Sequence, residues 1–285
     1  MEVLKCKDLE RSILENLKER VESLKETFDI EPALVMISVG EDPASKTYVA
    51  KKEKVAKQLG IHAVQVNLPD NVSEEDLLTE VKKYTYTTPT IVQLPLPPHI
   101  NTDKVVNTIC SRTDVDGFSA LNIGNMLLGQ PCYIPATPKG ILKILGYFNV
   151  DVNGRAVAIV GRSNIVGRPL ANLLSDKSHN ATVTLCHSHT QNLSQILKQM
   201  DIVIVATGHP GTVTVSDVRP DAVIIDVGVN RVPDTSERGW HLEGDFSPVG
   251  VEDTDIRYTP VPGGVGLLTV AMLAENTVEF YENHF

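Results

Sequence analysis

The chain has 285 residues, of which 42% are hydrophobic and 22% are charged, and its formal net charge is −10. This length accommodates two domains of ordinary size, and the composition is that of a globular protein. The acidic charge argues against a broad electrostatic surface for nucleic acid or anionic membranes, but it leaves room for a local basic pocket that binds a phosphorylated small molecule.

The N-terminal segment, residues 1–20, has the pattern of a charged amphipathic helix and not that of a signal or transit peptide. No apolar run approaches the roughly 20 residues that span a bilayer. The four cysteines, at positions 6, 110, 132 and 186, are widely separated, which is typical of reduced thiols and not of a disulfide framework. We therefore expect a cytoplasmic enzyme or binding protein.

Strand-like and helix-like segments alternate along the whole chain, which predicts an α/β fold with a mostly parallel sheet. In the first half, the predicted buried strands are 33–40, 63–69 and 90–97, and the predicted helices are 43–59 and 73–84. A loop over 112–125 precedes a helix that Thr137 is expected to cap, with Pro138 at its first position.

A second series of continuous apolar strands begins near residue 150, as expected for strands that are covered on both faces. Its predicted members are 156–161, 181–186, 201–208 and 222–230. A Gly/Pro loop followed by a long helix, within 258–280, closes the series. We predict one domain over 1–149 and another over 150–265, with the helix 266–285 packing back onto the first.

The segment GRSNIVGRPL, residues 161–170, lies where a dinucleotide-binding fold places its phosphate-binding turn. Gly161 ends the strand, Ser163 replaces the second glycine of G-x-G-x-x-G, and Gly167 comes one residue later than the third. Small residues at a helix N-terminus allow backbone N–H groups to approach a phosphate. A tight strand–helix turn without a ligand has the same pattern, so this segment alone leaves both interpretations open.

The end of the next strand, CHSHT at 186–190, has no acidic residue for the ribose hydroxyls of NAD. Arg162 and the hydroxyl of Ser188 instead suit a 2′-phosphate, which favours NADP. A metal site formed by Cys186, His187 and His189 is the alternative. We disfavour it because adjacent strand residues point to opposite faces and no second ligand cluster is evident.

Tyr48 and Lys52 stand at positions i and i+4 of the predicted helix 43–59, on one face. A phenol beside an ammonium group is a plausible pair for proton transfer, since a lysine near a cationic substrate loses its proton more readily. Pairs with this spacing are also common on ordinary helices. The other lysines of the segment, at positions 46, 51, 54 and 57, are interpreted as a solvated face.

Further polar side chains of the first half lie at the end of a predicted strand and in a predicted loop. Gln93 precedes the prolines of VQLPLP, which end the strand and expose its edge to ligand. Asp114 and Asp116 lie in the loop DVDGFS, where they could bind a divalent ion, cap a turn or hydrogen-bond a nitrogen-rich ring. Two carboxylates alone make a poor metal site, so we favour ring recognition for Asp116.

Taken together, these motifs resemble the FolD family of methylenetetrahydrofolate dehydrogenase–cyclohydrolases, and the resemblance covers nearly the whole chain. The motifs, in family order, are YVAKK, VQLPLP, DVDGF, TPKGI, GRSNIVGRP, VIIDVGVN and TPVPGGVG…TVAMLAENT. The sequence departs from the common family pattern at Ala136, at Phe246 and at Leu267–Leu268, and none of these positions is a proposed catalytic group.

The resemblance implies an N-terminal three-layer α/β domain, a C-terminal Rossmann-like NADP-binding domain and a folate cleft between them, in a cytoplasmic homodimer. It also implies oxidation of 5,10-methylenetetrahydrofolate to the 5,10-methenyl form and hydrolysis to 10-formyltetrahydrofolate, within one-carbon metabolism and purine biosynthesis. Folates are then the partners, with no nucleic acid, membrane or metal. A monofunctional dehydrogenase, a dehydrogenase of another substrate and a non-catalytic NADP sensor are the alternatives.

By motif position, the resemblance makes Lys52 the proton-transfer residue, oriented by Tyr48 and supported by Gln93, with Asp116 on the pterin ring. The expected substrate-binding residues are Tyr48, Lys52, Val92, Gln93, Leu94, Asp116, Pro262, Gly263, Gly264, Val265 and Gly266. The expected NADP-binding residues are Gly161, Arg162, Ser163, Ile165, Ser188 and Val229.

Overall fold

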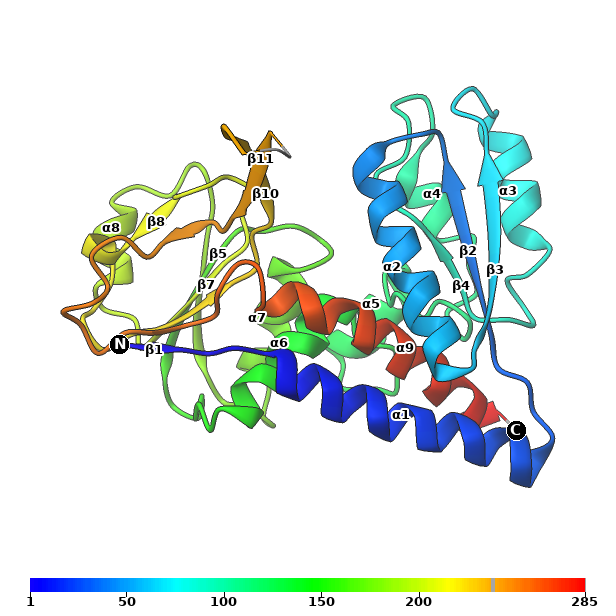
Figure 1. The fold of residues 1–285 in the computed structure, drawn as a ribbon, viewed down its shortest axis with the longest axis horizontal. Coiled ribbons are helices and arrows are strands. Elements are labelled where there is room, and N and C mark those ends of the chain that lie inside the picture. The colour runs from blue at the N-terminus through cyan, green and yellow to red at the C-terminus, as the bar shows by residue number, and fades with distance from the viewer. Residues whose placement is uncertain (237–238, 285) are drawn as a thin grey trace. The chain divides into compact units, whose positions relative to one another are not determined.

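The computed structural model describes residues 1–236 and 239–284, which form two compact units. Unit 1 comprises Met1–Glu10 and Thr137–Thr269, and unit 2 comprises Arg11–Ala136 and Val270–Phe285. Each unit is built around a parallel sheet with helices packed against it, so the predicted two-domain α/β class is confirmed (Figure 1). Among the described residues, no helix is both long and apolar enough to cross a membrane.

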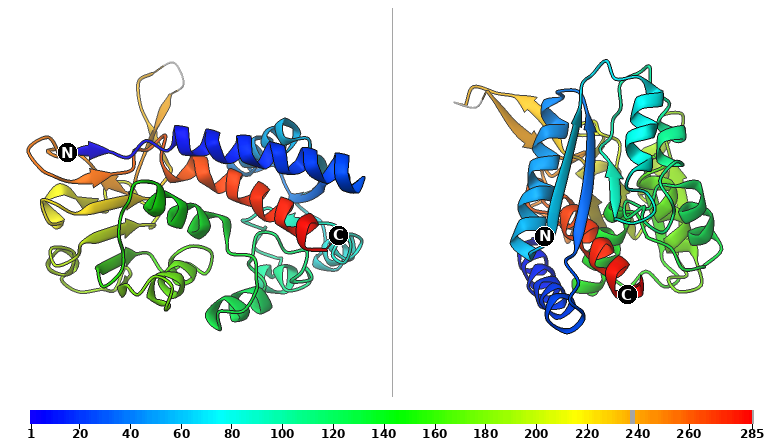
Figure 2. Two further views of the ribbon diagram at one scale, coloured as in Figure 1. Left: turned by 90° about the horizontal axis from the view of Figure 1, so that it is seen from below. Right: turned by 90° about the vertical axis from the view of Figure 1, so that its right-hand side faces the viewer.

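The sheet of unit 2 has the order β3-β2-β4, with β2 at Ala33–Val39, β3 at His62–Leu68 and β4 at Thr90–Val92. Both strand pairs are parallel. The helices α2, Pro43–Leu59, and α3, Glu74–Lys82, lie on opposite faces of this sheet, as the right-hand view of Figure 2 shows. Two shorter helices follow, α4 at Thr102–Val106 and α5 at Ala120–Leu127.

Local sequence explains where the helices of this unit begin and end. The Asp42 carboxylate accepts a hydrogen bond from Ser45 N at 2.7 Å and caps α2, and Gly60 ends the helix with φ of 79°. The Ser73 hydroxyl caps α3 in the same way, by accepting from Asp76 N. One buried cluster fills the space between the sheet and α3: Val35, Ile37, Val39, Leu77, Leu78, Val81, Val92, Ile100, Val105 and Ile109.

Two long helices, α1 at Lys7–Phe28 and α9 at Val265–His284, contribute residues to both units. They lie side by side in both views of Figure 2, and within unit 2 the Arg20 guanidinium bonds the Glu282 carboxylate. The Tyr281 hydroxyl bonds both the N–H and the C=O of Ala33, and the Asn276 amide donates to Val115 O at 2.8 Å. The last turns of α9 are therefore anchored to the sheet and loops of unit 2.

The main sheet of unit 1 has the order β1-β13-β9-β7-β5-β6, and every strand pair in it is parallel. Its strands are β1 Glu2–Val3, β5 Ala156–Val160, β6 Thr182–Cys186, β7 Ile202–Val205, β9 Val223–Asp226 and β13 Arg257–Tyr258. The accompanying helices are α6 Ala136–Tyr147, α7 Gly167–Ser175, α8 Leu193–Leu197 and the 3-10 turn Val215–Asp217. The order places β5 in the interior, between β6 and β7.

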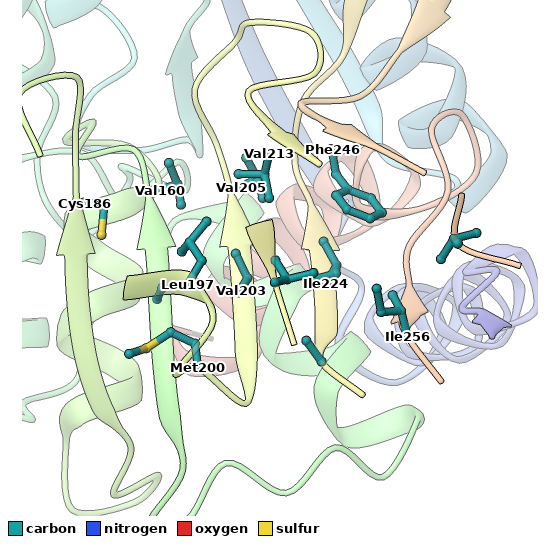
Figure 3. Packing of buried hydrophobic residues seen from close by; sticks show 14 residues of the cluster. Val160, Cys186, Leu197, Met200, Val203, Val205, Val213, Ile224, Phe246 and Ile256 are labelled. Carbon is teal, nitrogen blue, oxygen red and sulfur yellow. The ribbon is translucent and has the colours of Figure 1, made fainter. Parts of the chain in front are cut away.

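Smaller elements complete unit 1. The strands β8, Val213–Thr214, and β12, Phe246–Ser247, pair in parallel, and an antiparallel hairpin joins β10, Asn230–Pro233, to β11, Trp240–Glu243. Figure 3 shows side chains of β5, β7 and β9 packing on one face of the main sheet against Leu197 of α8. This buried cluster holds the C-terminal ends of the central strands in place.

The structure corrects several predicted elements of the first half. Residues 1–20 are not one helix, because β1 pairs with β13 before α1 begins. The strand 63–69 is an edge strand whose residues alternate between exposed and half-buried, so it is not buried. The predicted loop 112–125 contains the first turns of α5, which the Ser119 hydroxyl caps.

Two predicted boundaries also change. The helix α6 begins at Ala136, so Thr137 lies in its first turn and is not its cap, and its hydroxyl instead bonds that of Thr269 at 3.1 Å. The strand predicted over 90–97 ends at Val92, because the prolines that follow have no N–H to continue the ladder.

Candidate active site

Unit 1 has an open pocket of about 560 Å³ at the C-terminal ends of β5, β6 and β7. Its lining residues are Val160, Gly161, Arg162, Ser163, His187, Ser188, Thr190, Leu193, Ala206, Thr207, His209 and Thr212. In open parallel sheets, ligands bind beyond the carboxyl ends of the strands, where the strand order reverses. The pocket lies at such a point, since the chain passes from β5 to β6 on one side and then to β7 on the other.

Close packing explains the two glycines of the turn that follows β5. Gly161 has φ of 128°, and a Cβ atom there would stand 2.1 Å from Ala206 O. A Cβ atom on Gly167 would stand 2.0 Å from Gly161 O. The late position of Gly167 thus serves the close approach of helix α7 to the strand end, the role of the third glycine in the usual motif.

Ser163, which replaces the second glycine, is tied to the N-terminus of α7. Its hydroxyl accepts hydrogen bonds from Val166 N at 3.2 Å and from Gly167 N at 3.4 Å. The exposed side chains of Arg162 and Ser188 line the same pocket from the ends of β5 and β6. Among the described residues that line the pocket there is an arginine and no carboxylate, which suits an anionic ligand.

The loop after β7 forms a wall of the pocket that the sequence motifs did not indicate. It contributes Thr207, His209 and Thr212. The buried carboxylate of Asp245 fixes this loop by accepting from Thr207 N at 2.5 Å and from Gly208 N at 2.8 Å. The position of this loop, directly after an interior strand of the predicted parallel sheet, was the feature of the sequence from which it could have been found.

Asp226, at the end of β9, organises the neighbouring backbone. Its carboxylate accepts hydrogen bonds from the N–H groups of Gly228, Asp245 and Phe246. Burial raises its pKa to about 6, although these three bonds oppose the shift. Asp226 also lines a second cavity of unit 1, of about 400 Å³, together with residues that include Thr259 and Pro260.

Two predicted cofactor residues, Ile165 and Val229, are partly exposed, at 40% and 41%, and lie outside the twelve residues that line the cofactor pocket. The predicted substrate loop, Pro262–Gly266, runs directly into α9, and Gly263 O accepts a hydrogen bond from Cys6 N. The expected ligand contacts of these residues stay predictions.

Unit 2 brings together the polar residues predicted from its helix and strand motifs. Lys52 Nζ, on α2, donates to Gln93 Oε1 at 3.1 Å, and Gln93 Nε2 donates to Leu94 O at 2.7 Å. The backbone N–H of Gln93 also donates to Ile37 O of β2. The sheet therefore fixes the position of the Gln93 side-chain amide, which accepts the hydrogen bond from Lys52. The side chain of Lys52 is half-buried.

The two aspartates of the 114–119 loop have different parts in it. The Asp114 carboxylate caps the turn, since it accepts from Gly117 N, Ser119 N and the Asn122 amide. Asp116 is buried, and burial raises the pKa of its carboxyl, a shift that the Lys52 charge opposes and the Asp114 charge adds to. Asp116 and Lys52 are thus electrostatically coupled.

Tyr48 is partly exposed on α2, one turn before Lys52. The ammonium group of Lys51 lies 5.9 Å from the centroid of the Tyr48 ring. Lys51 therefore belongs beside the predicted tyrosine–lysine pair and not only to a solvated face.

The alternative metal site of Cys186, His187 and His189 concerns the turn after β6, within the described residues 1–236 and 239–284. No group of three or more His, Cys, Asp or Glu side chains there is arranged to hold an ion. His187 Nδ1 accepts a hydrogen bond from His189 N at 3.1 Å, so that ring nitrogen is engaged by its own turn.

Residues 135–285 match the family model described as tetrahydrofolate dehydrogenase/cyclohydrolase, NAD(P)-binding domain, and residues 4–116 match the catalytic domain of the same family. The chain belongs to this family. A bifunctional protein FolD of Streptococcus thermophilus is 45% identical over 280 residues, covering 97% of this chain and 96% of the relative. That of Chlorobium phaeobacteroides is 41% identical over 289 residues, covering 99% and 97%.

Solved structures of the tetrahydrofolate dehydrogenase/cyclohydrolase family have the same fold. The bifunctional FolD of Campylobacter jejuni superposes with a TM-score of 0.94 at 39% identity and covers 100% of both chains. That of Trypanosoma brucei, complexed with NADP cofactor and inhibitor, gives 0.93 at 33% identity and covers 99% of this chain and 97% of its own. The chain therefore has the catalytic and the NAD(P)-binding domain of a bifunctional dehydrogenase/cyclohydrolase, and the resemblance found from its motifs is confirmed.

Proposed function

We propose that this chain oxidises 5,10-methylenetetrahydrofolate with NADP and hydrolyses the 5,10-methenyl product to 10-formyltetrahydrofolate, with Lys52 as the proton-transfer residue. The observation that supports this role is the bond from Lys52 Nζ to Gln93 Oε1, which aligns the lysine from a fixed strand end. Because Gln93 is itself bonded to the sheet, it can hold the lysine nitrogen in one place while that nitrogen exchanges a proton with substrate.

The pocket of unit 1 fits a phosphorylated dinucleotide. Gly161 and Gly167 leave no space for a Cβ atom, so the backbone forms the close turn such ligands require, and Arg162 supplies positive charge. In our proposal, Arg162 and Ser188 hold the 2′-phosphate, Gly161 and Ser163 lie along the pyrophosphate, and Ile165 and Val229 contact the remainder. NADP, when bound, accepts the hydride from the methylene carbon.

Lys52 acts in the second reaction. The methenyl carbon lies between two nitrogens that share its positive charge, so water attacks it readily once positioned. As the water oxygen bonds to this carbon, a neutral Lys52 accepts one of the two water protons. One C–N bond then breaks, the departing nitrogen takes up the remaining hydroxyl proton and becomes N–H, and the C–O bond becomes the carbonyl of the formyl group. Gln93 keeps the lysine nitrogen in place, and Tyr48, at i−4 on the same helix, borders the substrate.

Asp116 binds the pterin ring edge in this proposal. Its buried carboxyl needs polar partners, and the N–H and NH₂ groups of a pterin supply donors to a carboxylate. The other proposed substrate contacts are Val92, Leu94 and the loop residues Pro262, Gly263, Gly264, Val265 and Gly266. We assign these groups to domains 1–149 and 150–265, with the helix 266–285 completing the first.

A spectrophotometric assay with methylenetetrahydrofolate tests both steps, by following NADPH and the methenyl intermediate separately. Lys52→Arg keeps a positive charge and a donor toward Gln93 but cannot give up its proton, so we expect hydrolysis to fall by about 100-fold or more. NADP affinity should be unchanged. Lys54→Ala, on an exposed part of the same helix, is the matched control. Normal hydrolysis in Lys52→Arg would refute the assigned role.

The closest alternative is a monofunctional dehydrogenase, which has no need for the Lys52–Gln93 pair. We also propose, from the family resemblance, a cytoplasmic homodimer that acts in purine biosynthesis. Light scattering at micromolar concentration tests the dimer, and a mass of one chain would exclude it.

A further inference from the structure

The cofactor pocket contains two histidines whose neutral forms carry the ring proton on different nitrogens. His187 comes from the end of β6, and its Nδ1 accepts a hydrogen bond from His189 N. His209 comes from the loop after β7, and its Nδ1 lies 2.9 Å from Thr207 O. A backbone N–H only donates and a carbonyl only accepts, so these two bonds fix where each proton lies.

The consequence is a difference in what Nε2 of each ring offers to a ligand. In neutral His187 the proton is on Nε2, which is a donor at every pH near neutrality. In neutral His209 the proton is on Nδ1, and Nε2 presents a lone pair that repels an anion. Protonation of His209 adds an N–H at Nε2 and leaves the bond to Thr207 O intact. The ring can then donate a hydrogen bond from Nε2 to an anion without changing its orientation.

The backbone around His209 is held in place. His209 N donates to the Thr207 hydroxyl, and the Thr212 hydroxyl donates to His209 O at 2.8 Å. The Asp245 carboxylate holds the same loop by accepting hydrogen bonds from Thr207 N and Gly208 N. The cationic or titratable groups that line the pocket beside His209 are Arg162 and His187.

We propose that His209 is a pH-gated contact of this pocket, which donates from Nε2 to the pyrophosphate of the dinucleotide when its ring is protonated. This rests on the proposed binding of NADP in the pocket. The pyrophosphate is the expected anion because it sits over the turn after β5, and β7 adjoins β5 on the side away from β6. The 2′-phosphate belongs instead to the β6 side, near Arg162 and Ser188.

Calorimetric titration with NADP and with NAD, at pH 6 and pH 8 and constant ionic strength, tests this. NAD is the cleaner probe, since it lacks the 2′-phosphate monoester, which itself takes up a proton near about pH 6. Imidazole side chains change charge between these two pH values, and an exposed charge pair changes affinity by about threefold. We therefore expect NAD to bind about threefold more weakly at pH 8 than at pH 6. NADP should show the same loss of affinity, together with any change caused by titration of its own 2′-phosphate.

Three variants make the result specific. His209→Gln should bind NAD equally at both pH values, and His209→Arg should bind it tightly at both. His189→Gln, an exposed histidine of the neighbouring turn that does not line the pocket, should keep the dependence of the unaltered protein. A dependence that persists in His209→Gln, or that His209 confers on NADP alone, would overturn the proposal. If neither dinucleotide binds at either pH, the proposed pocket function fails instead.

Discussion

Buried carboxylates organise both units, and backbone N–H groups satisfy much of their hydrogen-bonding capacity. Asp114 closes the loop that carries Asp116, Asp226 closes the turn after β9, and Asp245 holds the loop after β7. Backbone donors fix geometry more strictly than flexible lysine or arginine side chains do. These aspartates therefore shape the walls on which the proposed ligand contacts lie.

Asp226 provides a test of this arrangement through pH. Its pKa is about 6 in the folded protein, above the ordinary 3.8. Between these values the folded protein keeps a proton that the unfolded chain has released, so stability from this group is gained as pH falls through 6 and lost as pH rises. The unfolding free energy of the unaltered protein, relative to Asp226→Asn, should thus increase by on the order of 2 kcal/mol from pH 7 to pH 4. Denaturant titrations at several pH values measure it, and a constant difference would contradict it.

Arg162 should decide between the two nicotinamide cofactors. Only NADP has a phosphate on the adenosine ribose, and the described pocket lining offers no carboxylate to hold the ribose hydroxyls of NAD. Arg162→Ala should therefore weaken NADP by about tenfold or more and NAD far less. Dissociation constants for both cofactors check this, and equal affinity of the unaltered protein for the two would refute the 2′-phosphate argument.

For individual residues, sequence motifs identified the candidate site residues more readily than the residues to which they bond. The spacing of Tyr48 and Lys52 predicted a shared helix face, and the family resemblance predicted Gln93 as the support of Lys52, to which it is bonded in the structure. The contact of Lys51 with the Tyr48 ring was not predicted. Long-range partners such as Asp245 have no local pattern in the sequence, because the residues they bond are far away along the chain. His209 was missed because it lies in the loop after β7, which no sequence motif marks as part of the pocket.

At the scale of elements, strands and helices with strong patterns were predicted well and their edges were not. Interior strands such as β5, β7 and β9 are continuous apolar runs, whereas β3 alternates as an edge strand does. The two-residue strands β8 and β12 form by pairing with each other across a long stretch of chain, so no local periodicity reveals them. The helix α5 was hidden in a loop prediction because it has only eight residues.

The junction of β5 and α7 yields a prediction at this scale. Gly167→Ala would place a Cβ atom 2.0 Å from Gly161 O, which forces the helix away from the strand. We expect the unfolding free energy to fall by about 1–3 kcal/mol and NADP affinity to fall with it. Gly146→Ala in α6 is the matched control, since its Cβ atom meets nothing within 4 Å and should stabilise the helix by about 0.5–1 kcal/mol. Equal melting temperatures for the two variants would contradict the packing argument.

For the whole molecule, alternation of strands and helices predicted two α/β units, with the helix 266–285 packing back onto the first, but it did not predict that the first ten residues belong with the second. The contact-based units exchange both ends: residues 1–10 belong with 137–269, and 270–285 belong with 11–136. The placement of residues 1–10 depends on the pairing of β1 with β13, which the pattern of that short segment does not specify. The lysine-centred residues and the cofactor pocket nevertheless belong to different units, since Lys52, Gln93 and Asp116 lie in unit 2 and the pocket lies in unit 1.

This division predicts that the two activities can be separated by substitution. Hydrolysis of added methenyltetrahydrofolate requires no hydride acceptor, so Arg162→Ala should hydrolyse it at nearly the rate of the unaltered protein while its NADP-dependent oxidation slows at limiting cofactor. Lys52→Arg should show the reverse, with NADP binding retained and hydrolysis lost. In that variant, oxidation should release the methenyl intermediate, which is visible spectrophotometrically. Parallel loss of both activities in either variant, with melting temperature unchanged, would show that the two units do not divide the chemistry in this way.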